Sequence, residues 1–358
     1  MATIREVARK SGVSIGTVSN VLNARDWKVS PATRERVLAA VRELNYQPSP
    51  AILRREPQGT RNLVVLLPRP SNPAPGNKLY LFSAYMNALM DGMLEESARS
   101  GWSLTFLVQP DAESDEAWLR KFVDGRCEGV ILVNQRKTSP VGDELVERGV
   151  AVVCLGSRPD GAQATYVDVD NVDAARNLTR HLIGLGHRRI LHIGGDPELS
   201  SANDRAAGYQ AEMEFAGLGD QVQIQWAEYV GPSGYDIALR VLTRPQRPTA
   251  LFCGNDHIAY CALRAAQNLE LRVPQDLSVV GFDDAPPEGR EPILTTVRQP
   301  LRRMGARAVS TLVARTVESD RATSSILLAG ELIVRHTTGP APDPKQDFRP
   351  RFHEPTEV

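Results

Sequence analysis

The sequence predicts an all-α helix-turn-helix head followed by an α/β core of two Rossmann-like subdomains. Three observations lead to this prediction: short amphipathic segments before residue 47, apolar runs alternating with helical stretches after residue 61, and a change of charge between the two parts. At 358 residues the chain is too long for one ordinary domain, so two or three domains are expected.

The head and the rest of the chain differ in charge, although the whole chain carries a formal net charge of −1. Residues 1–61 contain 11 Lys and Arg against 5 Asp and Glu, whereas the remainder contains 31 against 38. A basic head on an acidic body suggests that the head meets a polyanion, although many basic segments are only solvated surface.

Two short helices are predicted in the stretch TIREVARKSGVSIGTVSNVLN. The first carries apolar residues at helical spacing on one face: Ile4, Val7 and Ala8. Gly12 is a natural helix stop. Ser14 begins the second helix, because its hydroxyl can accept a hydrogen bond from the backbone N–H of Gly16 or Thr17.

The second helix has an apolar face and a small, polar face. The apolar face is expected to be buried: Val18, Val21 and Leu22. A third helix is predicted from Ser30-Pro31, a cap followed by proline at the first helical position. It contributes four further core residues: Val37, Leu38, Val41 and Leu44.

Two short helices joined by a tight turn and braced by a third form a helix-turn-helix, whose second helix enters the DNA major groove. The alternative is an ordinary three-helix bundle. The basic charge and the small polar outer face of the second helix both favour DNA.

Residues 1–49 resemble the head of LacI/GalR-type transcriptional regulators. The segments that carry the resemblance are MATIREVARKSGVSIGTVSNVLN and VSPATRERVLAAVRELNYQPS. The resemblance implies that Ile15, Gly16 and Asn20 read the operator, and that Ser14, Thr17 and Ser19 contact phosphates or support the helix. Ile15 then touches a thymine methyl, and Asn20 pairs with an adenine edge or reaches a phosphate. Gly16 offers no side chain, so part of the usual readout is missing.

The segment SPAILRREPQ, between the third helix and the first core strand, falls where this family has its hinge helix. A helix of about six residues is marginal alone, so DNA and a partner subunit are expected to hold it. In the resembling proteins a leucine from this helix wedges into the minor groove. A gapless alignment places Arg55 there, so either Leu53 or Ile52 serves as the wedge, or Arg55 reads a narrow A·T-rich groove. The full predicted DNA-binding set is Thr3, Ser14, Ile15, Gly16, Thr17, Ser19, Asn20, Asn23, Ile52, Leu53 and Arg55.

Seven compact apolar runs with helix-like stretches between them predict parallel α/β sheets. These runs span residues 63–68, 103–108, 129–134, 150–155, 189–194, 249–254 and 277–282. A core of about 275 residues is too long for one sheet, which favours two Rossmann-like halves. No GxGxxG follows a strand, and Gly194-Gly195-Asp196 lacks the spacing, so a dinucleotide site has little support.

Polar residues follow several of these runs, and loops after the strands bind ligands in open α/β sheets. Residues expected to converge are Asp168, Asp170, Asn171, Arg205, Asn255, Asp256, Asp283 and Asp284. The segments SANDRAAGY, LFCGNDHIAYCAL and LSVVGFDD resemble the LacI/GalR core, which is similar to type I periplasmic sugar-binding proteins. The resemblance implies that Arg205, Asn255 and Asp283 bind the effector. An arginine supplies a fork for hydroxyls or a carboxylate, and an aspartate accepts two vicinal hydroxyls. Asp256 and Asp284 are expected to have structural roles instead.

Two departures from the family pattern leave the effector open. About ten extra residues precede the helix after the first strand, within 73–85, so Tyr80, Phe82 or Tyr85 replaces the usual aromatics. Gly156 stands where a carboxylate often follows the strand.

The predicted domains are a DNA-binding head (1–46), a hinge (47–61), an effector-binding and dimerisation core (62–337) and a disordered tail (338–358). The two lobes of the core are assigned to 62–164 with 296–325, and to 165–295 with 326–337. The chain is thus expected to be a cytoplasmic, non-catalytic repressor that binds operator DNA as a homodimer, or as a higher oligomer, under control of a carbohydrate effector.

No metal, cofactor or nucleophile motif is found. His181, His187 and His192 lack the spacing of ligands on one helical face, and His187 is expected to close a helix end. The cysteines show no CxxC pairing, and Cys154 and Cys253 are expected to be buried thiols. The rival functions are a cytoplasmic sugar-binding protein and an α/β enzyme.

Overall fold

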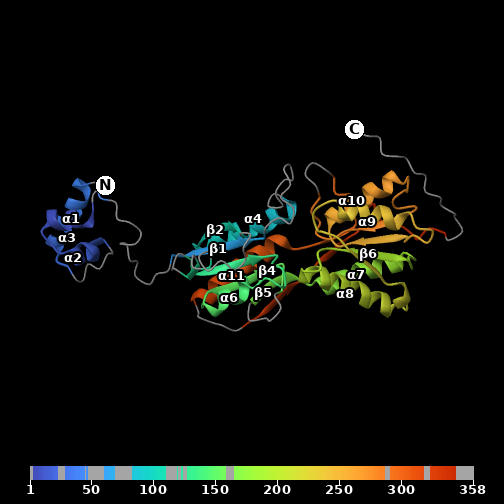
Figure 1. Ribbon diagram of the computed structural model, residues 1–358, viewed down its shortest axis with the longest axis horizontal. Helices are drawn as coiled ribbons and strands as arrows, with labels where there is room; N and C mark the ends of the chain where they lie inside the picture. Colours follow the sequence, from blue (N-terminus) through green and yellow to red (C-terminus); the bar gives the residue numbers. More distant parts are fainter. Residues whose placement is uncertain are drawn as a thin grey trace. The chain divides into compact units, whose positions relative to one another are not determined.

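The computed structural model divides the chain into two compact units, residues 1–61 and 62–358. Each unit is described by itself (Figure 1). The residues that the structure describes are 3–22, 29–44, 46, 60–68, 83–109, 119, 122–123, 127–158, 165–286, 291–317 and 323–343.

The head contains three helices, α1 (Ile4–Ser11), α2 (Ile15–Leu22) and α3 (Pro31–Glu43), as the sequence predicts. Their apolar faces meet in a small core in which Val7, Val18 and Val37 are fully buried. The other predicted apolar residues pack around these three, and Tyr46 completes the cluster. A short helix is marginal in isolation, so this shared core holds the three helices together.

The helix starts of the head follow the predicted capping chemistry. Ser14 Oγ accepts from the backbone N–H of Thr17 at 3.1 Å, and Ser30 Oγ accepts from that of Thr33 at 3.3 Å. Gly12 ends α1 in a left-handed conformation with φ 66°, which favours glycine. The turn between α1 and α2 is therefore fixed by local sequence.

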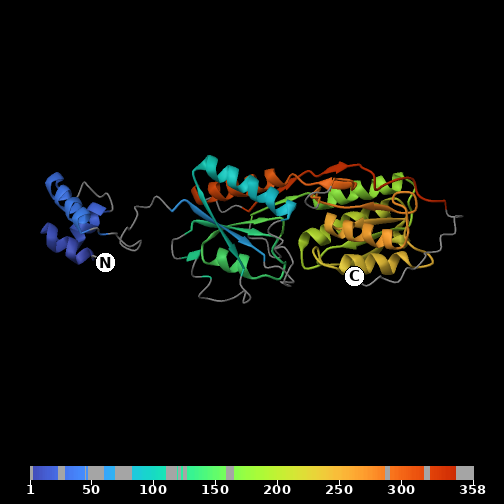
Figure 2. The ribbon, with the colours of Figure 1, turned by 90° about the horizontal axis from the view of Figure 1, so that it is seen from above.

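The first lobe of the core is built on six parallel strands: β1 (Asn62–Leu67), β2 (Ser103–Val108), β3 (Gly129–Val133), β4 (Ala151–Leu155), β5 (Thr165–Val169) and β11 (Ser325–Leu328). Their order in the sheet is β11-β5-β4-β3-β1-β2. Helices α4 (Ala84–Ser100) and α11 (Leu301–Val317) pack side by side on one face (Figure 2). Helix α6 (Val141–Glu147) covers the other face. Alternate residues of a strand point to opposite faces of the sheet, and the set on this face belongs to the same buried cluster as Val141 and Leu145 of α6.

The second lobe has four parallel strands in the order β7-β6-β8-β9: β6 (Ile190–Gly194), β7 (Gln223–Trp226), β8 (Ala250–Cys253) and β9 (Ser278–Val280). Helices α7 (Asn171–Gly184) and α8 (Ser200–Phe215) pair on one face. Helices α9 (Ser233–Leu242) and α10 (Asp256–Asn268) pair on the other. All seven apolar runs of the sequence are strands in the two sheets, which confirms the predicted α/β core.

The chain passes between the lobes at the junction of β5 and α7, and again through β10 (Thr296–Arg298) and β12 (Glu331–Ile333), which pair antiparallel. The predicted lobe boundary at residue 165 is wrong, because β5 pairs with β4 and with β11 in the first lobe. Hydrogen bonds between parallel strands decide to which lobe β5 belongs. The chain enters the second lobe only at α7.

The prediction of a disordered tail from residue 338 is wrong for residues 338–343. Gly339 and Ala341 are tied to the second lobe, the latter through its N–H to Leu185 O at 2.9 Å. His187 is fully buried and contacts Thr249 Oγ1, Ser278 Oγ and Gly339 O within 3.1 Å, so it needs this segment as a partner. Residues 344–358 lie outside the described residues.

His187 also closes the end of α7, since its N–H bonds to Leu182 O at 3.2 Å. Burial lowers the pKa of its imidazole to about 4, so the ring is neutral. No group of three metal-ligating side chains occurs among the described residues. Cys154 and Cys253 are buried free thiols, as predicted. In the described part of the chain, no helix is both long and apolar enough to cross a membrane.

Candidate functional site

The outer face of α2 is the candidate DNA-reading surface of the head. Val18 and Val21 point into the core, whereas Ile15 is 45% exposed and Gly16 is exposed beside it. Ile15 is therefore available for contact with a partner. Thr17, Ser19 and Asn20 are half-buried. Ser14 and Thr17 join their hydroxyls at 2.9 Å, so both also support the helix start.

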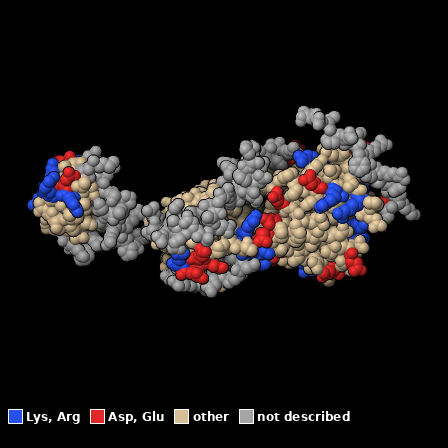
Figure 3. Space-filling model, viewed as in Figure 1, with Lys and Arg blue, Asp and Glu red and all other residues tan. Residues whose placement is uncertain are grey.

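Thr3 lies at the start of α1, where its N–H donates to Glu6 Oε2 at 2.7 Å. Basic side chains gather on part of the head surface (Figure 3). The exposed basic residues of the three described head helices are Arg5, Arg9, Lys10, Arg34, Arg36 and Arg42. The predicted contact Asn23 and the hinge residues Ile52, Leu53 and Arg55 lie outside the described residues.

Arg205 of α8 is the centre of the candidate effector site. Its side chain is only 6% exposed, and its guanidinium lies 3.7 Å from the centroid of the Phe282 ring. Arg205 Nε donates to Asn171 Oδ1 at 2.8 Å, and Nη1 donates to Gly254 O at 2.5 Å. Nη1 also lies 3.8 Å from Asp283 Oδ1. The guanidinium thus links residues that follow β5, β8 and β9.

A relay of side chains orients Arg205 from the first lobe. Asp168, in β5, accepts from the amide of Asn171 at 3.0 Å and from Val169 N–H at 2.8 Å. Asn171 in turn accepts from Arg205, which fixes the angle of the guanidinium. Asp168 and Asn171, both expected to converge with Arg205, therefore do so.

Burial raises the pKa of Asp283 to about 8 and that of Asp168 to about 7, although the Arg205 guanidinium opposes both shifts. Asp283 has φ 132° and accepts from Gln299 Nε2 at 2.7 Å. A non-glycine residue in this conformation is strained, and such strain is concentrated at functional sites.

Asn255 caps α10, because its Oδ1 accepts from Ile258 N–H at 2.9 Å. Its amide nitrogen donates to Tyr229 O at 3.0 Å, which holds the loop after β7. Asn255 lies next to Gly254 and hence beside Arg205. The three predicted effector residues, Arg205, Asn255 and Asp283, thus lie together at the carboxyl-terminal edge of the strands. Asn255 also has a structural role there.

Asp256 and Asp284 serve the structure, as expected. Asp256 binds Thr296 Oγ1 at 2.6 Å and Ala285 N–H at 2.8 Å. Asp284 pairs with Arg298 at 2.8 Å and Arg335 at 2.7 Å. Asp170 caps α7 by accepting from Asp173 N–H at 3.0 Å. These carboxylates fix the loops that carry the site.

The first lobe brings Tyr85 of α4 and Asn134, which follows β3, to the same edge. The Tyr85 hydroxyl donates to Asn134 Oδ1 at 3.5 Å. Burial, followed by the charges of Asp283 and Asp168, raises the pKa of Tyr85. Among the three aromatic residues considered from sequence, Tyr85 is described and lies at the site; Tyr80 and Phe82 lie outside the described residues.

Gly156, which stands where the family often has a carboxylate, has no room for a side chain. A Cβ there would lie 2.3 Å from Asn134 Oδ1 and 3.1 Å from the Tyr85 hydroxyl. Its φ of 70° also favours glycine. The side chains of Tyr85 and Asn134 thus occupy the space that a side chain at this position would enter.

Polar contacts join the rims of the two lobes around this site. Arg136 pairs with Asp196 at 3.1 Å, and Arg158 pairs with Asp204 at 2.8 Å. Thr138 donates to Glu198 Oε2 at 3.1 Å. Arg205, Asn255 and Asp283 are all buried beneath these contacts, so the described conformation is closed.

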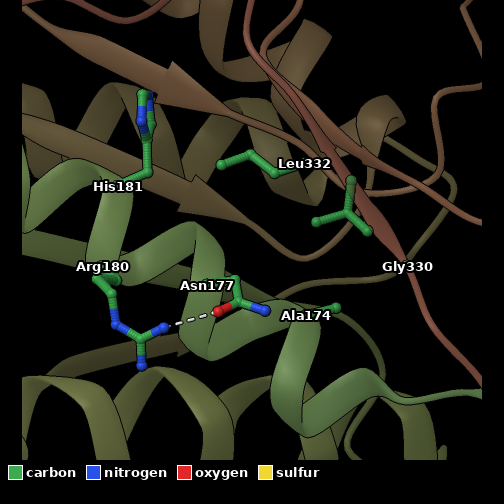
Figure 4. Close-up of a pocket in the computed structure, with 7 residues that line it drawn as sticks. Ala174, Asn177, Arg180, His181, Gly330 and Leu332 are labelled. Atoms are coloured by element: carbon green, nitrogen blue, oxygen red, sulfur yellow. Dashed lines mark hydrogen bonds between the residues drawn. The ribbon is translucent and has the colours of Figure 1, made fainter.

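A cavity of about 460 Å³ lies elsewhere, between α7 and the strands β10 and β12 (Figure 4). Its polar side chains already have protein partners. Arg180 donates to Glu212 and to Asn177, and His181 contacts Thr338 Oγ1 at 3.2 Å. The residues that the sequence predicts to bind the effector do not line this cavity.

Sequence reasoning did not identify Asn134, Tyr229, Phe282 and Gln299 as site residues. Asn134 and Phe282 end two of the apolar runs, so their places after strands were a usable signal. Tyr229 follows the short strand β7, which has no apolar run to reveal it. Gln299 reaches Asp283 from the position directly after β10, and no local pattern marks such a contact.

Comparisons with known proteins agree with this arrangement of head and core. Residues 3–49 match the model described as "Bacterial regulatory proteins, lacI family". Residues 179–338 match the "Periplasmic binding protein-like domain". The chain is 31% identical over 349 residues to the transcriptional repressor PurR of Haemophilus influenzae (strain PittEE), covering 94% of this chain and 98% of that protein. It is 32% identical over 340 residues to the transcriptional regulator CelR of Thermobifida fusca, with the same coverage of both chains.

Solved structures give the same result. A complex of the regulator CelR with cellobiose has a TM-score of 0.70 and 29% identity, covering 94% of this chain and all of that one. The lac repressor dimer bound to operator and an anti-inducer has a TM-score of 0.72 and 25% identity, covering 94% and 99%. With a matching head, a matching core and relatives aligned over nearly their whole length, the chain belongs to the LacI family and is a DNA-binding transcriptional regulator.

Proposed function

We propose that this protein is a cytoplasmic transcriptional repressor whose dimer binds a near-palindromic operator under control of a small carbohydrate effector. The observation that carries the proposal is the outer face of α2, where Ile15 and Gly16 are exposed above a fully packed core. The titles of similar structures support the rest, since one regulator is in complex with cellobiose and one repressor is a dimer on its operator.

The α2 residues make the base contacts in this proposal. Ile15 meets a thymine methyl, Asn20 reads an adenine edge or a phosphate, and Gly16 allows close approach of the backbone. Ser14, Thr17 and Ser19, together with Thr3, contact phosphates or hold the helix start. Asn23 and the hinge residues Ile52, Leu53 and Arg55 complete the DNA-binding surface.

The core is proposed to sense the effector through Arg205, Asn255 and Asp283, without catalysis. Effector binding changes the relative stability of two arrangements of the lobes, and the heads respond through a coupling worth typically about 1–3 kcal/mol. The proposed head (1–46), hinge (47–61) and core (62–337) carry these roles, with β5 and β11 assigned to the first lobe. A dimer doubles the DNA contacts and sets the half-site spacing, and a higher oligomer is compatible with the same head.

Fluorescence anisotropy with a labelled near-palindromic duplex and a scrambled duplex tests this proposal. Affinity is expected to fall steeply with salt. In a plot of the logarithm of the association constant against the logarithm of the salt concentration, each phosphate contact contributes about −0.9 to the slope. Asn20→Ala is expected to weaken specific binding by about 1–3 kcal/mol. Binding to scrambled DNA stays unchanged if Asn20 reads an adenine edge, and weakens equally if Asn20 contacts a phosphate.

Asp220→Asn is the matched control, because Asp220 is exposed in the short 3₁₀ helix Gly219–Gln221 of the core. Its operator affinity should equal that of the parent protein. Absence of any sequence-specific complex at low salt would sink the proposal.

A further inference from the structure

The rims of the two lobes are joined by contacts from two loops of the first lobe. In the loop after β3, Lys137 N–H donates to Glu198 O at 2.9 Å. In the loop after β4, Arg158 donates twice to α8, from its N–H to Ser200 Oγ and from Nη2 to Asp204 Oδ1, both at 2.8 Å. Ser200 and Asp204 are four residues apart, so they lie on one face of the helix and Arg158 contacts one turn of α8.

These contacts form one group with the Arg136–Asp196 ion pair and the Thr138–Glu198 hydrogen bond. The rim clasp is defined here as residues 136–138 and 158 of the first lobe together with residues 196–204 of the second lobe. Two of its contacts are ion pairs, and the other three are uncharged donors bonded to a carbonyl, a hydroxyl and a carboxylate.

Each half of the rim clasp is held in shape within its own lobe. In the first lobe, Gln135 N–H donates to Ser157 Oγ at 3.1 Å, which ties the two loops together. In the second lobe, Asp196 Oδ1 accepts from Glu198 N–H at 3.0 Å, and its Oδ2 accepts from Arg136. When the lobes close, two preorganised surfaces meet, so few side chains lose freedom.

The rim clasp is separate from the proposed effector residues and from the places where the chain crosses between the lobes. Arg205, Asn255 and Asp283 make none of its contacts. The crossings lie at the junction of β5 and α7 and in β10 and β12. A hinge motion at these crossings can therefore break every clasp contact while the two sheets stay intact.

The arginines of the rim clasp reach solvent. The side chains of Arg136 and Arg158 are 49% and 45% exposed, whereas those of their partners Asp196 and Asp204 are mostly buried. Salt screens such pairs, and a single exposed pair contributes little to stability. Two pairs that act together with three hydrogen bonds stabilise closure more than one pair does, and still leave the lobes able to separate.

From these contacts we propose that the rim clasp is a closing device of the core, which stabilises the closed arrangement of the lobes through bonds between protein groups alone. This inference rests on the proposed two-state response of the core. Because only the closed arrangement contains the clasp, the clasp sets the fraction of closed protein. An effector that binds the closed core is bound more weakly, in proportion, when that fraction falls.

A disulfide across the rim measures closure in the full-length protein. Lys137→Cys and Glu198→Cys are combined, because their backbones are in direct contact, as a disulfide requires. The rate of disulfide formation under mild oxidation is followed by mass spectrometry, with the parent protein and its four native cysteines as the blank. The disulfide is expected to form within one chain. Its failure to form would show that the rims do not meet, and would overturn the proposal.

Charge reversal in this two-cysteine background tests the clasp itself. Arg158→Glu faces Asp204 with a like charge, so the rate should fall by about threefold or more. Adding Asp204→Arg restores an opposite pair and should recover most of the rate. Arg307→Glu makes the same change on the exposed surface of α11 and should leave the rate unchanged.

Equal rates in Arg158→Glu and Arg307→Glu would overturn the proposal, and so would a rate that Asp204→Arg does not recover. Operator binding, measured by anisotropy on the same proteins without the cysteine changes, separates this inference from the proposed function. Operator binding without any effect of Arg158→Glu on the rate keeps the DNA-binding function and removes the clasp. The reverse result keeps the clasp and removes that function.

Discussion

The head and the core present their functional residues in opposite ways. The head carries its proposed contacts along one helix of eight residues, with Ile15 and Gly16 in solvent. The core buries Arg205 and gathers its partners from positions as far apart as 168 and 283. Local sequence can specify the first surface, whereas the second exists only when two sheets are assembled.

The carboxyl groups of the two regions differ in the same sense. A hydrogen bond from Thr3 N–H lowers the pKa of the exposed Glu6 in the head. Burial raises the pKa of Asp283 and Asp168 in the core. The fold of the head therefore favours the charged form of Glu6. In the core, burial makes the charged forms of Asp283 and Asp168 unfavourable, and the rest of the fold must offset the free energy of ionising them.

Removal of the Arg205 side chain is expected to have the largest effect on stability. Arg205→Ala leaves Asp283, Asn171 and Gly254 O without their buried partner, which typically costs about 3–5 kcal/mol. Denaturant unfolding of the full chain measures this loss. Arg240→Ala, on the exposed surface of α9, should change stability by less than about 0.5 kcal/mol. Equal unfolding midpoints for the two variants would contradict a central role for Arg205.

The pH dependence of stability tests the burial of Asp283. Its pKa is about 8 in the folded protein and near 3.8 in the unfolded chain, so the folded state binds the extra proton between these values. Stability should therefore fall as the pH rises from 5 to 8, by up to about 1.4 kcal/mol per pH unit for one proton.

Asp283→Asn keeps the acceptor for Gln299 and cannot ionise. Its stability relative to the parent protein should rise with pH over this window. A difference that stays constant from pH 5 to 8 would show that Asp283 ionises freely in the folded protein.

A methyl group at Gly156 is expected to cost about 1–3 kcal/mol, because its Cβ would lie 2.3 Å from Asn134 Oδ1. Gly149→Ala is the matched control, since Gly149 has a similar φ of 81° and nothing within 4 Å of its Cβ position. Thermal or denaturant unfolding compares the two. An equal loss in both variants would mean that backbone strain, rather than packing against Asn134, determines the effect.

Loss of the α2 cap is expected to have the smallest effect. Ser14→Ala removes the acceptor for Thr17 N–H and should destabilise the head by about 1 kcal/mol. Ser14→Asp retains a cap and should restore most of that stability. Backbone amide hydrogen exchange in α2 reports the change, and unaltered protection in Ser14→Ala would show that the core formed with α1 and α3 suffices.

The strands illustrate how far the sequence predicts the core. Seven strands coincide with apolar runs, because buried parallel strands need apolar residues on both faces. The strands β5, β7, β10, β11 and β12 have no such run, since they carry polar or exposed residues. Pairing with neighbours defines them, which is why the predicted lobe boundary at residue 165 was wrong.

The candidate effector site shows the same division. The family resemblance implied Arg205, Asn255 and Asp283, and the places after strands indicated Asp168 and Asn171. The role of Asn255 as the α10 cap and the stacking of Arg205 on Phe282 depend on contacts that the sequence pattern does not contain. Their binding of an effector stays a prediction.

By itself, the sequence determined the head, the capping residues Ser14 and Ser30, the alternation of strands and helices, and the split in charge. Each of these depends on residues within one or two helical turns or on composition. Only the tertiary structure decided which sheet β5 joins, which partners hold Arg205, and how little space Asn134 leaves for a side chain at position 156. Those features depend on atoms brought together from distant parts of the chain, and burial rather than local propensity fixes their energies.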